Sequence, residues 1–440
     1  MATVHENAED AYGRLTGAVK DSGDFWKIGN CFDTLTDYRR QIGSADLPML
    51  AMIRDRYDKT VNTSSACWYD DYCWWAIASA KAFDPAYQEI FGNQDNFFQQ
   101  LARDNWQVVD TGKADEVHLG APQAFTNRDN LTFFNPKPKP EVYWVTPRFD
   151  HGRQSGLHGV WQYDIFSNTR DREHNWFGPP ECSGGTNPSW PKDSWLGPYQ
   201  LTLVNSLYFL MAQQIPGVSY QLADSYGFLR AWLGYDPDNK PGADHEGQDL
   251  SLVIIREEDG TTIALPRERV STYAMNPEKP EPHDDYPKVE YWIYPEEDGS
   301  PDRSWAGDIG LLLRALVGYR TDHREDPVGN GLIQPLILGY LSHLVTDGVP
   351  QPYWPAGDQL FGKDDGDYKS GIGVFMRGVL QSFWAGDDLV VSLVKDAPFQ
   401  QFLKSAKSWA NDQLDDPTLD MFGLFNVLAT LTLALALGVT

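Results

Sequence analysis

The chain has 440 residues, of which 41 % are hydrophobic, enough to bury one large core or two ordinary ones. Its formal net charge is -26, from 62 acidic and 36 basic residues, which disfavours binding to nucleic acid or to an anionic membrane surface. Its four cysteines form no Cys-x-x-Cys pair, so we expect no zinc site, and no other metal ion or cofactor. Cys31, Cys67, Cys73 and Cys182 are free buried thiols or include one disulfide.

Apolar residues recur every three or four positions along most of the chain, a pattern that indicates helices. The pattern predicts helices near 5–19, 27–42, 46–59, 68–83, 86–103, 199–215, 219–234, 304–320, 330–347, 369–385, 397–412 and 420–437. Stretches such as LTLVNSLYFLMAQQI are apolar on every side and belong inside, whereas QQFLKSAKSWANDQL has a polar face and belongs outside. We therefore predict an all-α fold of about twelve helices in an inner and an outer ring.

Two long stretches break the helical pattern. Residues 110–198 are rich in Pro, Gly and Asn, and residues 236–303 contain LSLVIIREEDGTTIALP, whose two apolar runs meet at Asp259-Gly260 and predict a β-hairpin. We interpret both stretches as partly β insertions in a single domain that spans residues 1–440. The acidic run KDDGD at 363–367 lacks the final Glu of a calcium loop, so we expect a solvated turn there.

The two ends of the chain favour neither export nor membrane insertion by themselves. The start, MATVHENAEDAYGRL, has no apolar signal-peptide core, which fits a cytoplasmic protein or a mature form without its leader. The end, LFNVLATLTLALALGVT, is too short to span a bilayer, so we expect a buried closing helix.

The most unusual local feature is WYDDYCWW at residues 68–75, where adjacent carboxyl groups at Asp70 and Asp71 are flanked by aromatic rings. Thr63, Ser64 and Ser65 lie upstream, where they could cap a helix whose N-terminus stabilises one carboxylate. Repulsion from that carboxylate raises the pKa of the other. One ionised and one protonated carboxyl group about 5 Å apart are what a retaining glycosidase needs, although two solvated acids early in a helix remain the alternative.

This segment and four others resemble glycoside hydrolase family 76, the α-1,6-mannanases. YDDYCWWAIA is similar to the family signature, and FWKIGNCFDTLTDYRRQIG resembles an early helix of the family, with Trp26 and Asn30 matching. HNWFGPPECSGGTNPSW, TLVNSLYFLMAQQI and YKSGIGVFMRGVL resemble further family segments, the last with Lys369, Gly371 and Arg377. The chain departs from the family in RSWAGDIGLLLRALV, where Trp305 and Asp308 replace a Tyr-Asn-Gln-Gly stretch.

The resemblance implies an (α/α)6 barrel and endo-acting hydrolysis of α-1,6-mannosidic bonds in α-mannan with retained configuration. It assigns Asp70 as the nucleophile and Asp71 as the acid/base. The residues expected to contact the substrate are Tyr69, Trp74, Trp75, Trp190, Asn205, Trp305 and Asp308. Asn205, inside an apolar helix, could equally hold a neighbouring helix. The family also implies a monomer that acts outside the cell or at the cell wall.

Three other functions are alternatives to this hydrolase. A transglycosylase of the same fold would remodel cell-wall mannan instead of hydrolysing it. A non-catalytic glycan-binding protein is a second possibility, but pure binding does not need a proton donor. A terpene cyclase would use a DDxxD or DxDD motif, and DDYCW is neither.

Overall fold

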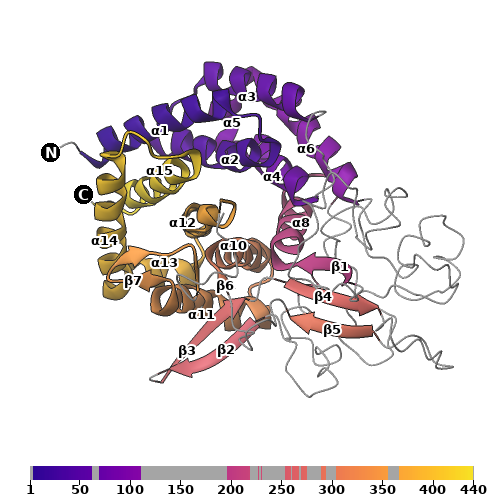
Figure 1. The fold of residues 1–440 in the computed structure, drawn as a ribbon, viewed down its shortest axis with the longest axis vertical. Coiled ribbons are helices and arrows are strands. Elements are labelled where there is room, and N and C mark those ends of the chain that lie inside the picture. The colour runs from indigo at the N-terminus through magenta and orange to yellow at the C-terminus, as the bar shows by residue number, and fades with distance from the viewer. Residues whose placement is uncertain are drawn as a thin grey trace, which may run out of the picture.

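The computed structural model of the chain describes residues 3–61, 69–110, 196–218, 226, 229, 253–258, 260–266, 269–274, 289–293, 304–354 and 366–439. Within these residues the architecture is a ring of helices inside a second ring (Figure 1). The predicted all-α double ring is confirmed. None of the helices that the structure describes is long and apolar enough to cross a membrane.

Six of the described helices form the inner ring. They are α2 (Phe25–Ile42), α4 (Tyr69–Ala80), α8 (Thr202–Gln214), α10 (Ala306–Asp322), α12 (Gly371–Trp384) and α15 (Met421–Ala436). Each of them packs against the next, and α15 packs against α2, so the ring closes. Because these helices have neighbours on almost every side, their apolar residues run all round: α15, for example, is buried without interruption from residue 424 to residue 434.

Most helices of the outer ring have one apolar and one polar face. Helix α11 (Pro327–His343) is the exception: it is apolar on nearly all sides, because strand β3 (Thr261–Pro266) also packs against it. The described members of the outer ring are α1 (Val4–Asp21), α3 (Leu47–Thr60), α6 (Asp95–Asp110), α11, α13 (Asp388–Lys395) and α14 (Ala397–Leu414). Helix α1 packs against α15 and α2, α6 against α4, and α11 against α10. Of the helix predicted at 219–234, only Tyr226 and Leu229 lie within the described residues.

Several boundaries differ from those that the sequence pattern predicts. The helices predicted at 199–215 and 304–320 begin in short strands, and the helix predicted at 330–347 ends in one. The helix predicted at 86–103 is divided: η1 (Lys81–Phe83), η2 (Pro85–Tyr87), α5 (Gln88–Phe91) and η3 (Gly92–Gln94) precede α6. The division lies at Gly92, whose φ of +53° interrupts helical backbone at a residue that tolerates it. The short helix α13 was not predicted, because its eight residues read as the loop before α14.

The described strands are short, and two of them lead directly into inner helices. β1 (Leu196–Leu201) pairs with β4 (Arg269–Ala274), which pairs with β5 (Val289–Ile293). β2 (Val253–Glu258) and β3 (Thr261–Pro266) form the predicted hairpin, β6 (Ser304–Trp305) pairs with β9 (Tyr353–Trp354), and β7 (Val345–Thr346) pairs with β8 (Val349–Pro350). β1 continues into α8 and β6 into α10, so both strands lie at the N-terminal end of an inner helix. That residues 110–198 and 236–303 are insertions in one domain stays a prediction.

Helices α10 and α12 approach each other through glycine. A methyl group at Gly310 would lie 2.6 Å from Cα of Phe375, and one at Gly378 would overlap the carbonyl group of Gly310. Backbone therefore faces backbone at this crossing, and neither side can move away without opening the inner ring.

We predict that Gly378→Ala lowers the free energy of unfolding by about 1–3 kcal/mol, because the added methyl group overpacks the crossing of α10 and α12. Gly17→Ala is the matched control: Gly17 is exposed in the middle of α1 with nothing near the position of the methyl group. The control should gain about 0.5–1 kcal/mol from helix propensity. Urea unfolding of both variants measures the difference, and equal stability would show that the crossing is not tight.

Candidate active site

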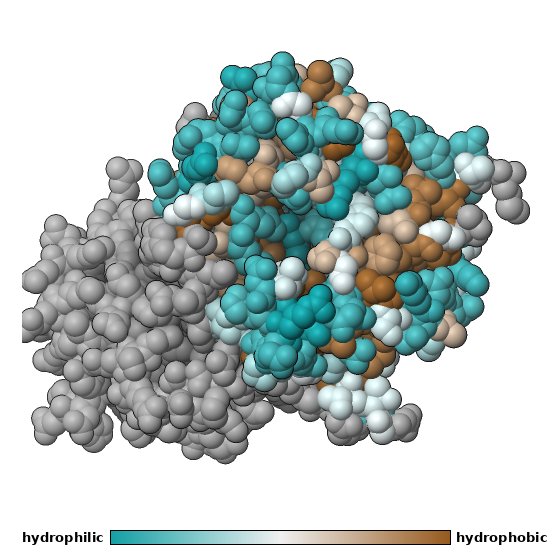
Figure 2. All heavy atoms as spheres, turned by 180° about the vertical axis from the view of Figure 1, so that it is seen from behind, coloured by the Kyte–Doolittle hydropathy of each residue, from teal (hydrophilic) through white to brown (hydrophobic). Residues whose placement is uncertain are grey.

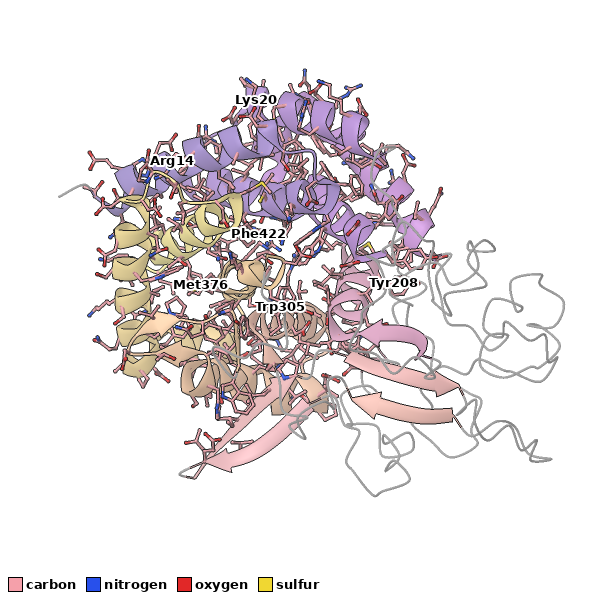
Figure 3. All side chains as sticks on the ribbon, viewed as in Figure 1. Arg14, Lys20, Tyr208, Trp305, Met376 and Phe422 are labelled. Carbon is pink, nitrogen blue, oxygen red and sulfur yellow. The ribbon has the colours of Figure 1, made fainter. Side chains whose placement is uncertain are left out.

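The N-terminal ends of the inner helices meet at one end of the barrel. Trp305, the residue before α10, donates a hydrogen bond from Nε1 to the backbone oxygen of Tyr368 at 2.9 Å, in η7 (Tyr368–Ser370) just before α12. Lys27, in the first turn of α2, lies 3.8 Å from a carboxylate oxygen of Asp367, also just before α12. In Figure 3, Trp305 and Phe422 lie toward the inside of the ring, whereas Arg14 and Lys20 project from its outer side.

Asp70 and Asp71 occupy the first turn of α4 at this end, and both are half-buried. The partial positive charge of a helix N-terminus stabilises a carboxylate in this position. Burial, followed by the charge of Asp70, raises the pKa of Asp71 well above its ordinary value, and Asp24 and Asp367 raise it further. Asp71 therefore keeps its proton to a higher pH than an exposed aspartic acid would.

The two tryptophans after the aspartates support α4 from behind. Trp75 is fully buried, and it donates from Nε1 to the backbone oxygen of Phe25 at 2.8 Å while its ring stacks on Phe25. Trp74 is 1 % exposed and lies against the guanidinium group of Arg377, 5.5 Å from its ring centre. The sequence predicts stacking surfaces at Trp74 and Trp75, but neither ring has a face left for a sugar. Their place in the structure is to fix the helix that carries the aspartates.

An aromatic surface at the same end comes instead from α2 and α15. Trp26 is half-buried, and its ring centre lies 5.2 Å from that of Phe422, the second residue of α15. The Lys27 ammonium group lies 5.6 Å from the centres of both rings and 2.9 Å from Asp24. Trp26 was singled out only as a matching residue, and no local pattern pointed to Phe422.

The other predicted contact residues lie in or beside the first turns of inner helices. Tyr69 begins α4, Asn205 lies in the first turn of α8, and Trp305 and Asp308 lie at the start of α10. All four are buried, Asp308 completely. The structure thus gathers them at the end that holds the aspartate pair. Trp190 lies outside the described residues.

The expected capping residues Thr63, Ser64 and Ser65 also lie outside the described residues, as do Cys67 and Cys182. Cys31 and Cys73 are buried free thiols, and burial raises the pKa of both. Among the residues that the structure describes, no group of three or more His, Cys, Asp or Glu side chains could hold a metal ion.

A buried ion cluster crosses the inside of the ring beneath this site. Its members are Asp33 and Asp37 on α2, Lys81 in η1 directly after α4, Arg314 on α10 and Arg377 on α12. Asp33 Oδ2 lies 3.0 Å from Arg377 Nε and 3.4 Å from Arg314 Nη1, and Oδ1 pairs with Lys81. Lys81 also lies 2.6 Å from Asp37. One carboxylate thus connects four inner-ring segments, including α2 and α10, which are not neighbours in the ring.

The cluster stays charged in spite of its burial. Burial alone would raise the pKa of Asp33, but its three cationic partners outweigh burial and hold that pKa below its usual range. Burial lowers the pKa of Lys81 and of Arg377, and the nearby carboxylates oppose this. Arg377 also donates to the backbone oxygen of Asn30 at 2.8 Å and to its side-chain oxygen at 3.0 Å. Asn30 and Arg377, which match the family segments, are therefore joined to each other.

Structural comparison relates this barrel to solved glycosidases. The α-1,6-mannanase of Salegentibacter sp. HEL1_6 aligns with a TM-score of 0.53 at 12 % identity, over 99 % of this chain and 99 % of that one. The mannosidase of glycoside hydrolase family 76 from Bacteroides thetaiotaomicron VPI-5482 aligns with a TM-score of 0.50 at 10 % identity, over 100 % and 98 % of the two chains. The chain has the fold of glycoside hydrolase family 76.

One more solved structure also aligns with this chain, and two sequence comparisons find no match. The Lin0763 protein from Listeria innocua shares the family 76 fold of this chain at a TM-score of 0.52 and 12 % identity, with 100 % and 98 % of the two chains covered. No family model and no curated protein matches the sequence. The relation to family 76 therefore rests on three-dimensional likeness together with the short segments quoted above.

We predict that Asp71→Asn makes the folded chain more stable near neutral pH. Below about pH 4 the Asp71 carboxyl group is mostly protonated in both the folded and the unfolded chain, so its ionisation does not lower the free energy of unfolding. As the pH rises, the unfolded chain releases this proton first, because the pKa of Asp71 is raised in the folded state, so folding stability falls until the folded pKa is passed. Asparagine has no proton to lose and removes this decline.

The measurement is urea unfolding of wild type and Asp71→Asn at several pH values between about 4 and 8. The stability difference should grow with pH in favour of the variant. Asp58→Asn, an exposed position on α3, is the control and should follow wild type. A constant difference across the range would mean that Asp71 is not buried against other carboxylates.

Proposed function

We propose that this protein is a retaining, endo-acting glycoside hydrolase that cleaves α-1,6-mannosidic bonds in α-mannan. The observation that carries the proposal is the aspartate pair in the first turn of α4, where Asp71 has a raised pKa and Asp70 lies beside it. A proton donor must remain protonated near the working pH, and a nucleophile must be ionised. Two adjacent carboxyl groups in unlike environments supply both.

In the proposed first step, Asp70 attacks the anomeric carbon of the mannosyl unit while Asp71 gives its proton to the glycosidic oxygen. The carbon–oxygen bond breaks, the alcohol leaves, and a covalent mannosyl ester forms on Asp70. In the second step, Asp71 takes a proton from water, which attacks the same carbon and releases Asp70. Two inversions leave the configuration unchanged.

The likeness to solved family 76 enzymes supports this substrate. An inactive variant of the Salegentibacter α-1,6-mannanase, in which two consecutive aspartates are replaced by alanine, forms a complex with α-1,6-mannotetrose. Asp70 and Asp71 are likewise consecutive, and they lie at the end where the inner helices begin. The half-buried ring of Trp26 beside Phe422 offers an apolar face of the kind on which sugar rings pack. An enzyme with this substrate works outside the cell or at the cell wall.

Two alternatives remain distinguishable from this proposal. A transglycosylase of the same fold would pass the mannosyl ester to another sugar instead of water, so elongated glycans would accumulate. A non-catalytic glycan-binding protein has no need of a carboxyl group with a raised pKa, and Asp71 has one.

The test is incubation with α-1,6-linked mannan and, in parallel, with α-1,2- and α-1,3-linked mannans and α-glucans. We predict release of α-1,6-linked oligosaccharides, with the new reducing ends in the α configuration by NMR at early times. Asp70→Asn should abolish the activity, and Asp71→Asn should reduce it about 10²–10⁴-fold. Release from α-glucan but not from mannan would reject the substrate, and longer glycans without free reducing ends would favour transfer.

A substrate with an activated leaving group separates the two aspartates. Such a group leaves without a proton, so Asp71→Asn should recover much of the first step, whereas Asp70→Asn should not. In Asp71→Asn, added azide should then attack the anomeric carbon of the mannosyl ester without help from a general base, displace Asp70 and give a mannosyl azide of retained configuration. Azide rescue with retention in Asp70→Asn alone would reverse the assignment.

The pH profile offers a second, independent check on Asp71. Its pKa is raised by burial, by Asp70 and then by Asp24, so Asp24→Asn removes a negative charge and lowers that pKa. A general acid with a lower pKa loses its proton at lower pH, so the alkaline limb of kcat/KM should move to lower pH. Asparagine still suits the N-cap position of α2. Asp58→Asn, at an exposed position, should leave the pH dependence of kcat/KM unchanged. If the alkaline limb of kcat/KM does not move in Asp24→Asn, the ionisation of Asp71 does not set that limb.

A further inference from the structure

A cavity of about 610 Å³ lies at the end of the barrel opposite the aspartate pair. Its walls come from the C-terminal parts of the inner helices α2, α4, α8, α10 and α12. Its charged residues are Arg40, Lys81 and Arg314 together with two exposed carboxylates, Asp84 and Asp322. Its uncharged residues include Gln214, Ser382 and Trp384. Seen from behind, the molecule shows hydrophilic residues around a hollow near the middle of its coloured surface (Figure 2).

The cavity borders an excess of buried positive charge. The ion cluster contains the cations Lys81, Arg314 and Arg377 but only two carboxylates, Asp33 and Asp37, so one positive charge exceeds the negative ones. Two of these cations, Lys81 and Arg314, line the cavity. A buried charge without a counterion is costly, and a bound anion would offset it.

Arg40 adds a further cation to the wall. Its guanidinium group lies 4.1 Å from the ring centre of Trp384 and 4.8 Å from that of Tyr87. Within the described part of the chain, no ion pair joins Arg40 to a carboxylate, whereas its neighbour Arg39 lies 3.7 Å from Glu9. The two rings hold Arg40 in a fixed position without neutralising it.

These cations do more than offset the negative ends of the helices. Arg314 lies in the middle of α10, not in its last turn, and its described hydrogen bond is a long one of 3.4 Å to Asp33. Asp33 already receives closer donors from Lys81 and Arg377. Among the described residues, the other N–H groups of the Arg314 guanidinium have no hydrogen-bond partner, and Arg314 lines the cavity.

Two uncharged side chains of the cavity wall have oxygens that lack a hydrogen-bond partner within the described residues. The side-chain oxygens of Gln214 and Ser382 are buried and have no hydrogen-bond partner among the described residues. Ser382 is 1 % exposed, and both side chains line the cavity. Buried polar groups nearly always have a partner, so a ligand with hydroxyl groups would complete them.

We propose that this cavity binds a small oxyanion that also carries hydroxyl groups, either a sugar phosphate or a sugar carboxylate. Arg314 and Arg40 bind the anionic group, and Gln214 and Ser382 bind hydroxyl groups. The volume lies within the range of roughly 300–1,000 Å³ that is usual for small-molecule sites. This site is separate from the proposed catalytic site and does not depend on the hydrolase assignment.

Isothermal titration calorimetry with mannose 6-phosphate, glucuronate, inorganic phosphate and mannose, all at one ionic strength, tests the proposal. Mannose 6-phosphate or glucuronate should bind at one site per chain, and mannose should bind at least about tenfold more weakly. The tighter of the two identifies phosphate or carboxylate as the anionic group. No binding of either, or equal binding of neutral mannose, would overturn the proposal.

Three variants locate the binding. Arg40→Gln removes a half-exposed cation of the wall and should weaken the anionic probe at least about tenfold, and Ser382→Ala should weaken it less. Arg39→Gln is the matched control, because Arg39 lies next in sequence, stacks 4.9 Å from Tyr12 and does not line the cavity. The double variant Asp70→Asn, Asp71→Asn should bind as wild type does. Affinity lost in the double variant but kept in Arg40→Gln would place the probe at the proposed catalytic site instead and refute the cavity site.

Discussion

One buried carboxylate holds the inner ring together. Asp33 on α2 accepts from Lys81, Arg314 and Arg377, which come from the end of α4, from α10 and from α12. Moving a carboxylate out of water has a large desolvation penalty, and several closely placed cations are needed to offset it. Because α2 and α10 face each other across the ring, this contact fixes the spacing of the ring itself. The tight glycine crossing of α10 and α12 and the packing of Trp74 on Arg377 involve the same inner helices.

The same ring geometry explains why two adjacent aspartates are stable in α4. All inner helices present their N-termini at one end, and the partial positive charge there favours a carboxylate. The second carboxyl group then lies among Asp70, Asp24 and Asp367 and holds its proton more tightly. The raised pKa of Asp71 is therefore partly a product of assembly, because Asp24 and Asp367 come from segments that are distant from α4 in the sequence.

The two ends of the barrel differ in their chemistry for the same reason. At the end where inner helices begin, the chain places carboxylates and the rings of Trp26 and Phe422. At the end where they finish, it places Arg40, Lys81 and Arg314 around a cavity. The ion cluster lies between the two, so the positive charges that balance Asp33 also shape the far cavity. The buried cations of this strongly acidic protein thus lie toward the cavity end of the ring.

The sequence by itself determined most of the helices, the burial of those that are apolar on every side, and the segment that holds the aspartate pair, since periodicity and a short motif are properties of contiguous residues. It erred where neighbours distant in sequence decide the outcome. Trp74 and Trp75 read as sugar platforms but are buried, because α2 and α12 cover their faces. A local cause explains one further error: the helix expected at 86–103 divides at Gly92, whose φ is positive. Arg314 in GLLLRALV was a visible sign, a cation inside an apolar run, yet only the fold supplied Asp33 as its partner. Burial and electrostatic potential depend on which helices meet, and that is decided by tertiary packing.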